Sequence, residues 1–260
     1  MDVQKFRQQI YDSARPLLQG RTVSDLVIGL SLLEVELDGK YYAVSYVLRD
    51  GLAGGCSVFS YATKAVGMSA EEAGAWFVNG KDDVQRAIGG AVLNAASRLL
   101  GLVDTGSRER PFDVDISPSD TVGMVGNIRP VAMQLKKLGC RMIIFDRGKC
   151  SRGNAAEDIY PMEQQAELLP ECDIVFLSGT TAVNGTAPAL LDMCSSARDI
   201  VMLGSSTPMI PGGYAGTGVS VLAGSWWPQE ARDEVFTLIS RAAGIQTLKQ
   251  YMIKKNVRIK

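Results

Sequence analysis

The feature that most constrains the fold of this chain is a short apolar run that ends abruptly in small polar residues. Residues 174–177 are apolar, and the segment that follows, residues 178–186 (Ser-Gly-Thr-Thr-Ala-Val-Asn-Gly-Thr), contains hydroxyls, an amide and two glycines. The same pattern returns at residues 199–208, and a looser copy stands at residues 121–127. Continuous apolar strands of this kind are typical of a parallel sheet covered by helices on both faces. Right-handed crossovers then bring the three polar loops to one sheet edge, where ligands bind.

The two halves of the chain follow different patterns. In the second half, helix-like segments alternate with the apolar strands, which indicates a Rossmann-like domain over residues 120–260. The first half has an amphipathic helix, three strands joined by tight turns and then further helices, which indicates an α+β domain over residues 1–103. The polar, proline-containing stretch 104–119 is expected to be a linker. The predicted fold class is therefore α/β, an α+β domain followed by a Rossmann-like parallel-sheet domain, and the cleft between them is a natural ligand site.

Composition and charge narrow the range of partners. The chain of 260 residues is 46% hydrophobic and 21% charged, which is ordinary for a globular protein. Its net charge is -1, and five basic residues without an acid are concentrated in residues 249–260, so the rest is acidic and nucleic acid is not expected as a partner. We interpret this tail as a solvated end. No apolar stretch has membrane-spanning length and the first residues do not resemble a signal peptide, so we expect a cytoplasmic protein without a membrane partner. The sequence leaves a homo-oligomer open.

The chain contains no histidine. This removes the commonest general base and the commonest transition-metal ligand together, so a Ser-His-Asp or Cys-His mechanism is excluded. Any metal bound by the protein itself has to be held by oxygen or thiolate ligands. The five cysteines are irregularly spaced and do not form a disulfide framework. We expect Cys140, Cys172 and Cys194 to be packing residues, whereas Cys56 and Cys150 lie in loops that could approach the cleft as metal ligands.

Most candidate ligand residues come from the three polar loops. Small side chains leave backbone N–H groups accessible and helix N-termini attract anions, although Ser, Thr and Asn are equally common as helix caps. Arg129 could clamp a carboxylate or phosphate, or form a surface salt bridge. Asp146 ends a strand roughly 20 residues after Gly126, where Rossmann domains place the acid that binds a ribose, but the full Gly-x-Gly-x-x-Gly fingerprint is absent. The candidates in this half are Gly126, Asn127, Arg129, Asp146, Gly179, Thr180, Thr181, Asn184, Thr186, Ser205, Ser206 and Thr207.

Residues 122–127 (Val-Gly-Met-Val-Gly-Asn), 178–186 and 203–208 (Leu-Gly-Ser-Ser-Thr-Pro) together resemble a prokaryotic family of unknown function labelled "putative heavy-metal chelation". The resemblance covers nearly the whole chain. It implies a first domain like the N-terminal domain of enolases, a Rossmann-like second domain, and a polar site between them that handles a metal or a metal chelate. Enolase activity does not follow, because enolase chemistry lies in a barrel that this chain is too short to contain.

The family pattern also places an acid at Glu34. The resemblance therefore makes Glu34 the preferred carboxylate for a metal or for proton transfer. The residues alone also permit a second interpretation, because strand alternation from Leu33 and Val35 would turn Glu34 outward.

Three classes of function follow. The first is binding of a small polar or anionic ligand in the interdomain cleft, in particular a heavy-metal chelate; it predicts that Glu34 and Asn184 point into one pocket. In this class the metal either arrives held by an organic ligand or binds carboxylates and Cys. The second is an enzyme with an adenosyl or nucleotide cofactor, which predicts that Asp146 faces a nucleoside-sized slot beside Gly126. The third is a non-catalytic carrier or sensor, for which the glycine-rich segment 208–218 would act as a mobile lid.

Overall fold

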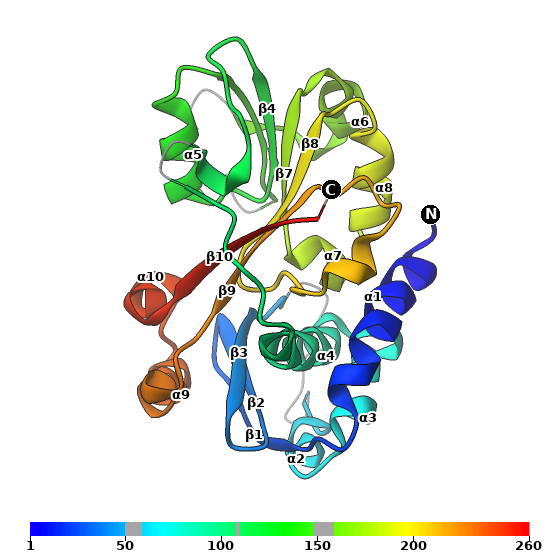
Figure 1. Ribbon diagram of the computed structural model, residues 1–260, viewed down its shortest axis with the longest axis vertical. Coiled ribbons are helices and arrows are strands. Elements are labelled where there is room, and N and C mark those ends of the chain that lie inside the picture. The colour runs from blue at the N-terminus through cyan, green and yellow to red at the C-terminus, as the bar shows by residue number, and fades with distance from the viewer. Residues whose placement is uncertain (50–58, 108–109, 148–158, 260) are drawn as a thin grey trace.

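The computed structural model describes residues 1–49, 59–107, 110–147 and 159–259. Within these residues the chain forms a three-stranded antiparallel sheet from its first half and a seven-stranded, mostly parallel sheet from its second half (Figure 1). This arrangement confirms the predicted α/β class, with an α+β half followed by a Rossmann-like half. No helix in the described part of the chain is long and apolar enough to cross a membrane.

The elements of the first half begin and end where local residues dictate. Asp2 and Ser69 cap the first two long helices through their side chains, and Asp82 caps the third. Asp38 and Gly39 both have positive φ, as a two-residue turn between antiparallel strands requires. The elements are α1 (Val3–Leu18), β1 (Val23–Ile28), β2 (Leu32–Leu37), β3 (Tyr41–Tyr46), α2 (Ala62–Ala65), α3 (Ala70–Asn79) and α4 (Asp83–Ala96).

The second half is built on strands in the spatial order β10-β9-β8-β7-β4-β5-β6, with β10 antiparallel to β9. The chain moves outward from β4 through β5 to β6, then returns to the other side of β4 for β7, so the direction of winding reverses between β4 and β7. The elements are β4 (Thr121–Val125), α5 (Arg129–Lys136), β5 (Arg141–Phe145), β6 (Ile159–Tyr160), α6 (Gln165–Leu168), β7 (Ile174–Ser178), α7 (Thr180–Asn184), α8 (Ala187–Met193), β8 (Asp199–Leu203), β9 (Val221–Trp226), α9 (Arg232–Ser240), α10 (Ile245–Leu248) and β10 (Ile253–Arg258). In a doubly wound sheet the crevice at this reversal is the usual ligand site.

Both faces of the large sheet are apolar and covered, as the continuous apolar strands predicted. Val122 and Met124 of β4 lie in the cluster that includes Val131 and Leu135 of α5. The alternate strand residues, such as Val125, lie in a second cluster with side chains of α8 and α1. That cluster is continuous with the core of the first half, so the two halves share apolar side chains.

The small sheet is also covered on both faces, and for this reason every residue of β2 is buried. Leu33 and Val35 lie in the cluster that contains α3 and α4 side chains. On the opposite face, Leu32 packs with Val235 and Ile239 of α9. The chain therefore leaves the large sheet after β9, places α9 on the small sheet and returns through α10 to β10 (Figure 1).

Buried hydrogen bonds join the halves. The Arg7 guanidinium of α1 donates to the backbone oxygen of Ala182 at 3.0 Å and also to that of Val183, at the end of α7. Asn94 of α4 donates its side-chain amide to the backbone oxygen of Ser205 at 3.2 Å. Both Arg7 and Asn94 are buried. The first half therefore contacts the loops that follow β7 and β8.

The glycine-rich segment 208–218 does not have the character of a lid. Met209, Ile210 and Tyr214 are buried, and the Tyr214 ring meets Phe6 of α1 edge-on with the ring centroids 6.0 Å apart. The glycines serve close packing, because a side chain at Gly213 would collide with the backbone of Ile10. The prediction of a mobile lid was wrong, since these side chains complete the core beside α1.

Replacing Arg7 by Leu should lower the free energy of unfolding by about 2 to 3 kcal/mol, because two buried backbone oxygens would lose a charged donor. Urea denaturation monitored by circular dichroism measures this change. The matched control is Arg15→Leu on the same helix. The exposed Arg15 side chain forms a surface pair with Glu71, and its loss should change stability by less than about 0.5 kcal/mol. Equal effects of the two substitutions would contradict the proposed importance of the buried contacts.

Candidate functional site

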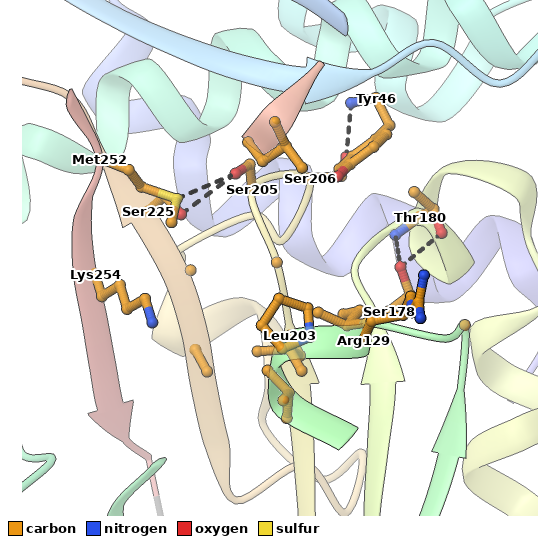
Figure 2. Close-up of a pocket in the computed structure, with 18 of the residues that line it drawn as sticks. Tyr46, Arg129, Ser178, Thr180, Leu203, Ser205, Ser206, Ser225, Met252 and Lys254 are labelled. Carbon is orange, nitrogen blue, oxygen red and sulfur yellow. Dashed lines mark hydrogen bonds between the residues drawn. The ribbon is translucent and has the colours of Figure 1, made fainter. Parts of the chain in front are cut away.

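A cavity of about 740 Å³ opens at the carboxyl edge of the large sheet. The loops after β4, β7 and β8 form one part of its wall, and β9, β10 and the segment that begins with α10 form the other (Figure 2). Tyr46 of the small sheet and Phe112 of the stretch predicted as a linker also line it. The cavity therefore lies beside the reversal point between β4 and β7.

The loop after β4 is fixed by Asp146. The backbone N–H of Asn127 donates to Asp146 Oδ2 at 2.8 Å, which ties the β4 loop to the end of β5. Gly126 has a φ of +91°, and a Cβ at this position would lie 3.0 Å from Ser178 Cβ. Glycine at position 126 thus lets the loop turn sharply and approach β7. Asp146 thereby anchors the loop at the edge of the cavity.

The first turn of α5 does not present backbone donors to an anion. The N–H groups of Val131 and Ala132 donate to the backbone oxygen of Ile128 at 2.9 and 3.0 Å, and Pro130 has no N–H. The expectation that helix N-termini would bind an anion through their amides is therefore not met at this helix. The positive group at this end of the cavity is the side chain of Arg129.

Hydroxyl groups line the loops after β7 and β8. Ser178 Oγ and Thr180 Oγ1 are 2.8 Å apart, and Ser205 Oγ donates to Ser225 Oγ at 3.3 Å. The Ser206 hydroxyl accepts from the backbone N–H of Tyr46 and from the Ser45 hydroxyl, both at 2.9 Å (Figure 2 shows the Tyr46 bond). These bonds hold the β8 loop against β3 of the first half.

The structure brings some of the predicted site residues together and separates others. Those that line the cavity are Gly126, Asn127, Arg129, Asp146, Thr180, Ser205 and Ser206. Gly179 and Thr207 lie in the adjoining loops and Thr181 lies in α7, but these three residues do not line the cavity. A Cβ at Gly179 would lie 2.4 Å from the Thr207 nitrogen. Asn184 and Thr186 lie at the far end of α7, where the Asn184 amide oxygen accepts from the Thr186 hydroxyl at 2.8 Å. Asn184 is thus on the α1 side, because a Cβ at the next residue, Gly185, would lie 3.1 Å from the Arg7 guanidinium.

The cysteines divide as follows. Cys140, Cys172 and Cys194 are buried, as predicted for packing residues. Burial raises the pKa of Cys172 to about 11 and that of Cys194 to about 12, so both stay protonated and unreactive at neutral pH. The candidate metal ligands Cys56 and Cys150 lie outside the described residues.

Much of the cavity wall comes from the C-terminal segment, so the prediction of a solvated tail was wrong. Lys249, Met252, Lys254 and Asn256 all line the cavity. They reach it because β10 pairs antiparallel with β9, with Lys254 opposite Ser225. Pairing of this kind depends on contacts outside the segment itself. The basic composition of the tail was the one signal in the sequence.

The cavity is positively charged. Arg129, Lys249 and Lys254 line it, against the single carboxylate of Asp146 among the described lining residues. The ion pairs found within the described part of the chain do not include any of these three cations. An anionic ligand is therefore favoured over a bare cation.

Glu34 lies elsewhere, on the face of the small sheet that α9 covers. Its side chain is fully buried, and its Oε1 atom is 3.4 Å from Arg232 Nε of α9. Arg232 is shared with Asp25 and Glu36, and within the described residues neither oxygen of Glu34 has a hydrogen-bond partner. Burial raises the pKa of Glu34 to about 8, while the charge of Arg232 acts in the opposite direction. Glu34 and Asn184 do not share a pocket.

In the part of the chain that the structure describes, the donor set does not fit a directly bound heavy metal. Across the described residues, His, Cys, Asp and Glu side chains do not gather in any group of three that could hold a metal ion. The cavity offers one carboxylate, several hydroxyls and amides, and three cations. Soft or borderline metals prefer thiolate and imidazole ligands, and the cations repel a free metal ion.

Fold and site together define the class of the protein: a Rossmann-like sheet with an α+β half docked at its carboxyl edge, and a cationic cavity at the reversal point. Residues 110–258 match the DUF364 family, and residues 11–97 match the DUF4213 family; both are described as "Putative heavy-metal chelation". The first match covers more than half of the chain, so the protein belongs to the DUF364 family.

Similar proteins share the fold and leave the function open. A DUF364 protein of unknown function from Pyrococcus horikoshii is 21% identical with a TM-score of 0.78, over 97% of this chain and 99% of that chain. Another, from Desulfitobacterium hafniense DCB-2, is 20% identical with a TM-score of 0.73, over 96% and 98%. An uncharacterised protein of Methanocaldococcus jannaschii is 28% identical over 145 residues, which span 55% of this chain and only 54% of that relative. The likeness of the first half to enolases stays a prediction.

Glu34→Gln should change how stability depends on pH. A glutamate in the unfolded chain has a pKa near 4.5, whereas Glu34 in the folded protein has a pKa of about 8. The folded state therefore binds this proton more tightly, and its stability falls as pH rises between these two values. The Gln variant lacks this loss, so it should gain stability relative to the parent by at most about 1.4 kcal/mol per pH unit between roughly pH 5 and pH 8.

Urea denaturation of both proteins at three pH values in this range measures the difference. The control is Glu163→Gln, which makes the same substitution at an exposed position. A constant difference for Glu34→Gln would show that Glu34 titrates normally.

Proposed function

We propose that the protein binds a small organic anion in the cavity at the carboxyl edge of the large sheet. The observation that supports this most is the charge of the wall, where Arg129, Lys249 and Lys254 face one carboxylate at a position where Rossmann-like sheets bind ligands. The volume of about 740 Å³ is within the usual range for small-molecule sites. Hydroxyl and amide groups between the cations would orient the bound molecule.

The ligand also has an apolar part. Ile128, Leu203, Ala223 and Met252 line the cavity between its polar groups. A fully hydrated inorganic ion would leave these side chains in contact with water or with charge, whereas an organic molecule would cover them. An aliphatic or ring-containing anion therefore fits better than phosphate or a metal ion alone.

An anion site is compatible with the family description of heavy-metal chelation. If a heavy metal is handled here, it enters as a complex with an organic acid, and the protein recognises the negative charge of that complex. Asp146 is the single carboxylate among the described lining residues, and one carboxylate beside three cations holds a free metal ion poorly. A metal ion on its own would then bind weakly or at another place.

A second candidate is a nucleoside-bearing cofactor. Asp146 and Gly126 both line the cavity, beside the reversal between β4 and β7. Rossmann domains bind a ribose with an acid at the corresponding strand end. In this case the Asp146 carboxylate would accept from ribose hydroxyls, and the adenosyl or nucleotide group would fill the slot beside Ile128. Enzymatic activity would depend on this cofactor.

Thermal shift and calorimetry with citrate, with nickel–citrate and with nickel ion alone test the first candidate. We expect both citrate forms to stabilise the parent protein, by about 2.7 kcal/mol when the free ligand is 100 times its dissociation constant. Arg129→Gln should weaken binding at least about ten-fold, because a charged donor is lost. Asn184→Ala is the matched control, since this residue is at the far end of α7 and should leave binding unchanged. Tight binding of nickel ion alone that Arg129→Gln does not weaken would refute the proposal.

Adenosine nucleotides and S-adenosyl compounds test the second candidate. Asp146→Asn keeps an acceptor for the Asn127 N–H but removes the negative charge, so the loop should stay in place. If a ribose binds at this carboxylate, nucleoside affinity should fall about ten-fold or more while citrate affinity does not fall. The same nucleoside affinity in parent and variant would exclude the ribose role of Asp146.

A further inference from the structure

We infer that the ligand is an elongated molecule with an acidic group at each end, one held by Arg129 and the other by Lys254. This inference rests on the proposed function, because it specifies which organic anion the cavity takes. The two cations lie on opposite sides of the cavity, and in Figure 2 the Lys254 ammonium is directed inward from β10.

The sheet order sets the distance between the two ends. Arg129 follows β4 and Lys254 lies on β10, with β7, β8 and β9 in between. Neighbouring strands are about 4.8 Å apart, so the two backbone positions are separated by roughly 19 Å along the sheet. Figure 2 shows the Lys254 side chain pointing inward from β10 and the Arg129 guanidinium beside Ser178, on the side away from Lys254, so the two charged groups stay well apart. A compact anion such as phosphate cannot contact both.

Among the described lining residues, none in the middle of the cavity carries a negative charge. Asp146 follows β5, which lies on the other side of β4 from the span toward β10. Within that span the lining residues Leu203, Gly204 and Ala223 offer apolar or bare backbone surface. A side chain built at Gly204 would meet nothing nearer than Ile128 Cδ1 at 4.0 Å, so this glycine leaves open space. The floor between the two cations therefore suits an uncharged chain or ring.

Lys249 is a further cation in the cavity wall. It lines the same cavity from the turn after α10, so the C-terminal segment contributes two cations and the α5 side contributes one. The hydroxyls of Ser178 and Thr180 add neutral donors near the first end. The expected ligand class is thus a dicarboxylate, or a carboxylate joined through an apolar spacer to a phosphate or a second acid.

Calorimetric titration with a series of linear α,ω-dicarboxylates and with the monocarboxylates of matching chain length tests this inference. We expect a diacid of favoured length to bind at least about ten-fold tighter than the matching monoacid, because a second charge-assisted contact is made. Arg129→Gln and Lys254→Gln should each reduce the diacid to the affinity of the monoacid. Arg241→Gln and Lys64→Gln are charge-matched controls at exposed positions away from the cavity and should have no effect.

The outcomes separate this inference from the proposed function. Equal affinity for mono- and diacids at every length, with Arg129→Gln still harmful, would overturn the two-ended ligand and leave the anion site standing. Loss of diacid binding in Arg129→Gln but not in Lys254→Gln would also overturn the two-ended ligand and leave the anion site standing. No binding of citrate, monoacid or diacid would refute the anion site itself. Because Arg129 and Lys254 are exposed, the melting temperature without ligand should be the same in both variants as in the parent. This measurement confirms that the variants fold.

Discussion

The architecture depends on the hydrogen bonds between the first half of the chain and the loop after β8. The Ser206 hydroxyl accepts from both the Tyr46 N–H and the Ser45 hydroxyl, and Asn94 donates to the backbone of Ser205. These groups are buried or partly buried, so leaving any of them unpaired would be costly. The bonds fix the β8 loop in the place where it lines the cavity. The same hydrogen bonds therefore fix both the docking of the two halves and the shape of the candidate site.

The route of the C-terminal segment connects the same parts a second time. After β9 the chain places α9 over the small sheet, where Arg232 faces the buried Glu34, and then returns as β10 to the edge of the large sheet. One continuous stretch thus covers the first half and supplies Lys249 and Lys254 to the cavity. Glu34, which the family resemblance placed in a ligand site, belongs to this covering contact instead. Its raised pKa reflects burial beneath α9.

The charge of the cavity reconciles the family description with a chain that has no histidine. A positively charged wall with one carboxylate is a poor place for a free metal ion, but it suits a metal that is already surrounded by a negatively charged organic ligand. Recognition would then depend on the shape and charge of the organic part. In that case the organic molecule supplies the metal ligands, and the protein does not have to supply them.

The sequence by itself determined the elements and the edge of the sheet at which the site lies. Apolar runs that end in polar loops are local signals, and Arg129, Asp146, Ser205 and Ser206 were found because they directly follow such strands. Only the tertiary structure decided that Lys254 lines the cavity, that Glu34 is covered by α9, and that segment 208–218 packs on α1. Each of these depends on contacts between residues far apart in the chain. Periodicity and local composition do not reveal such contacts, because the contacts form only when whole elements pack together.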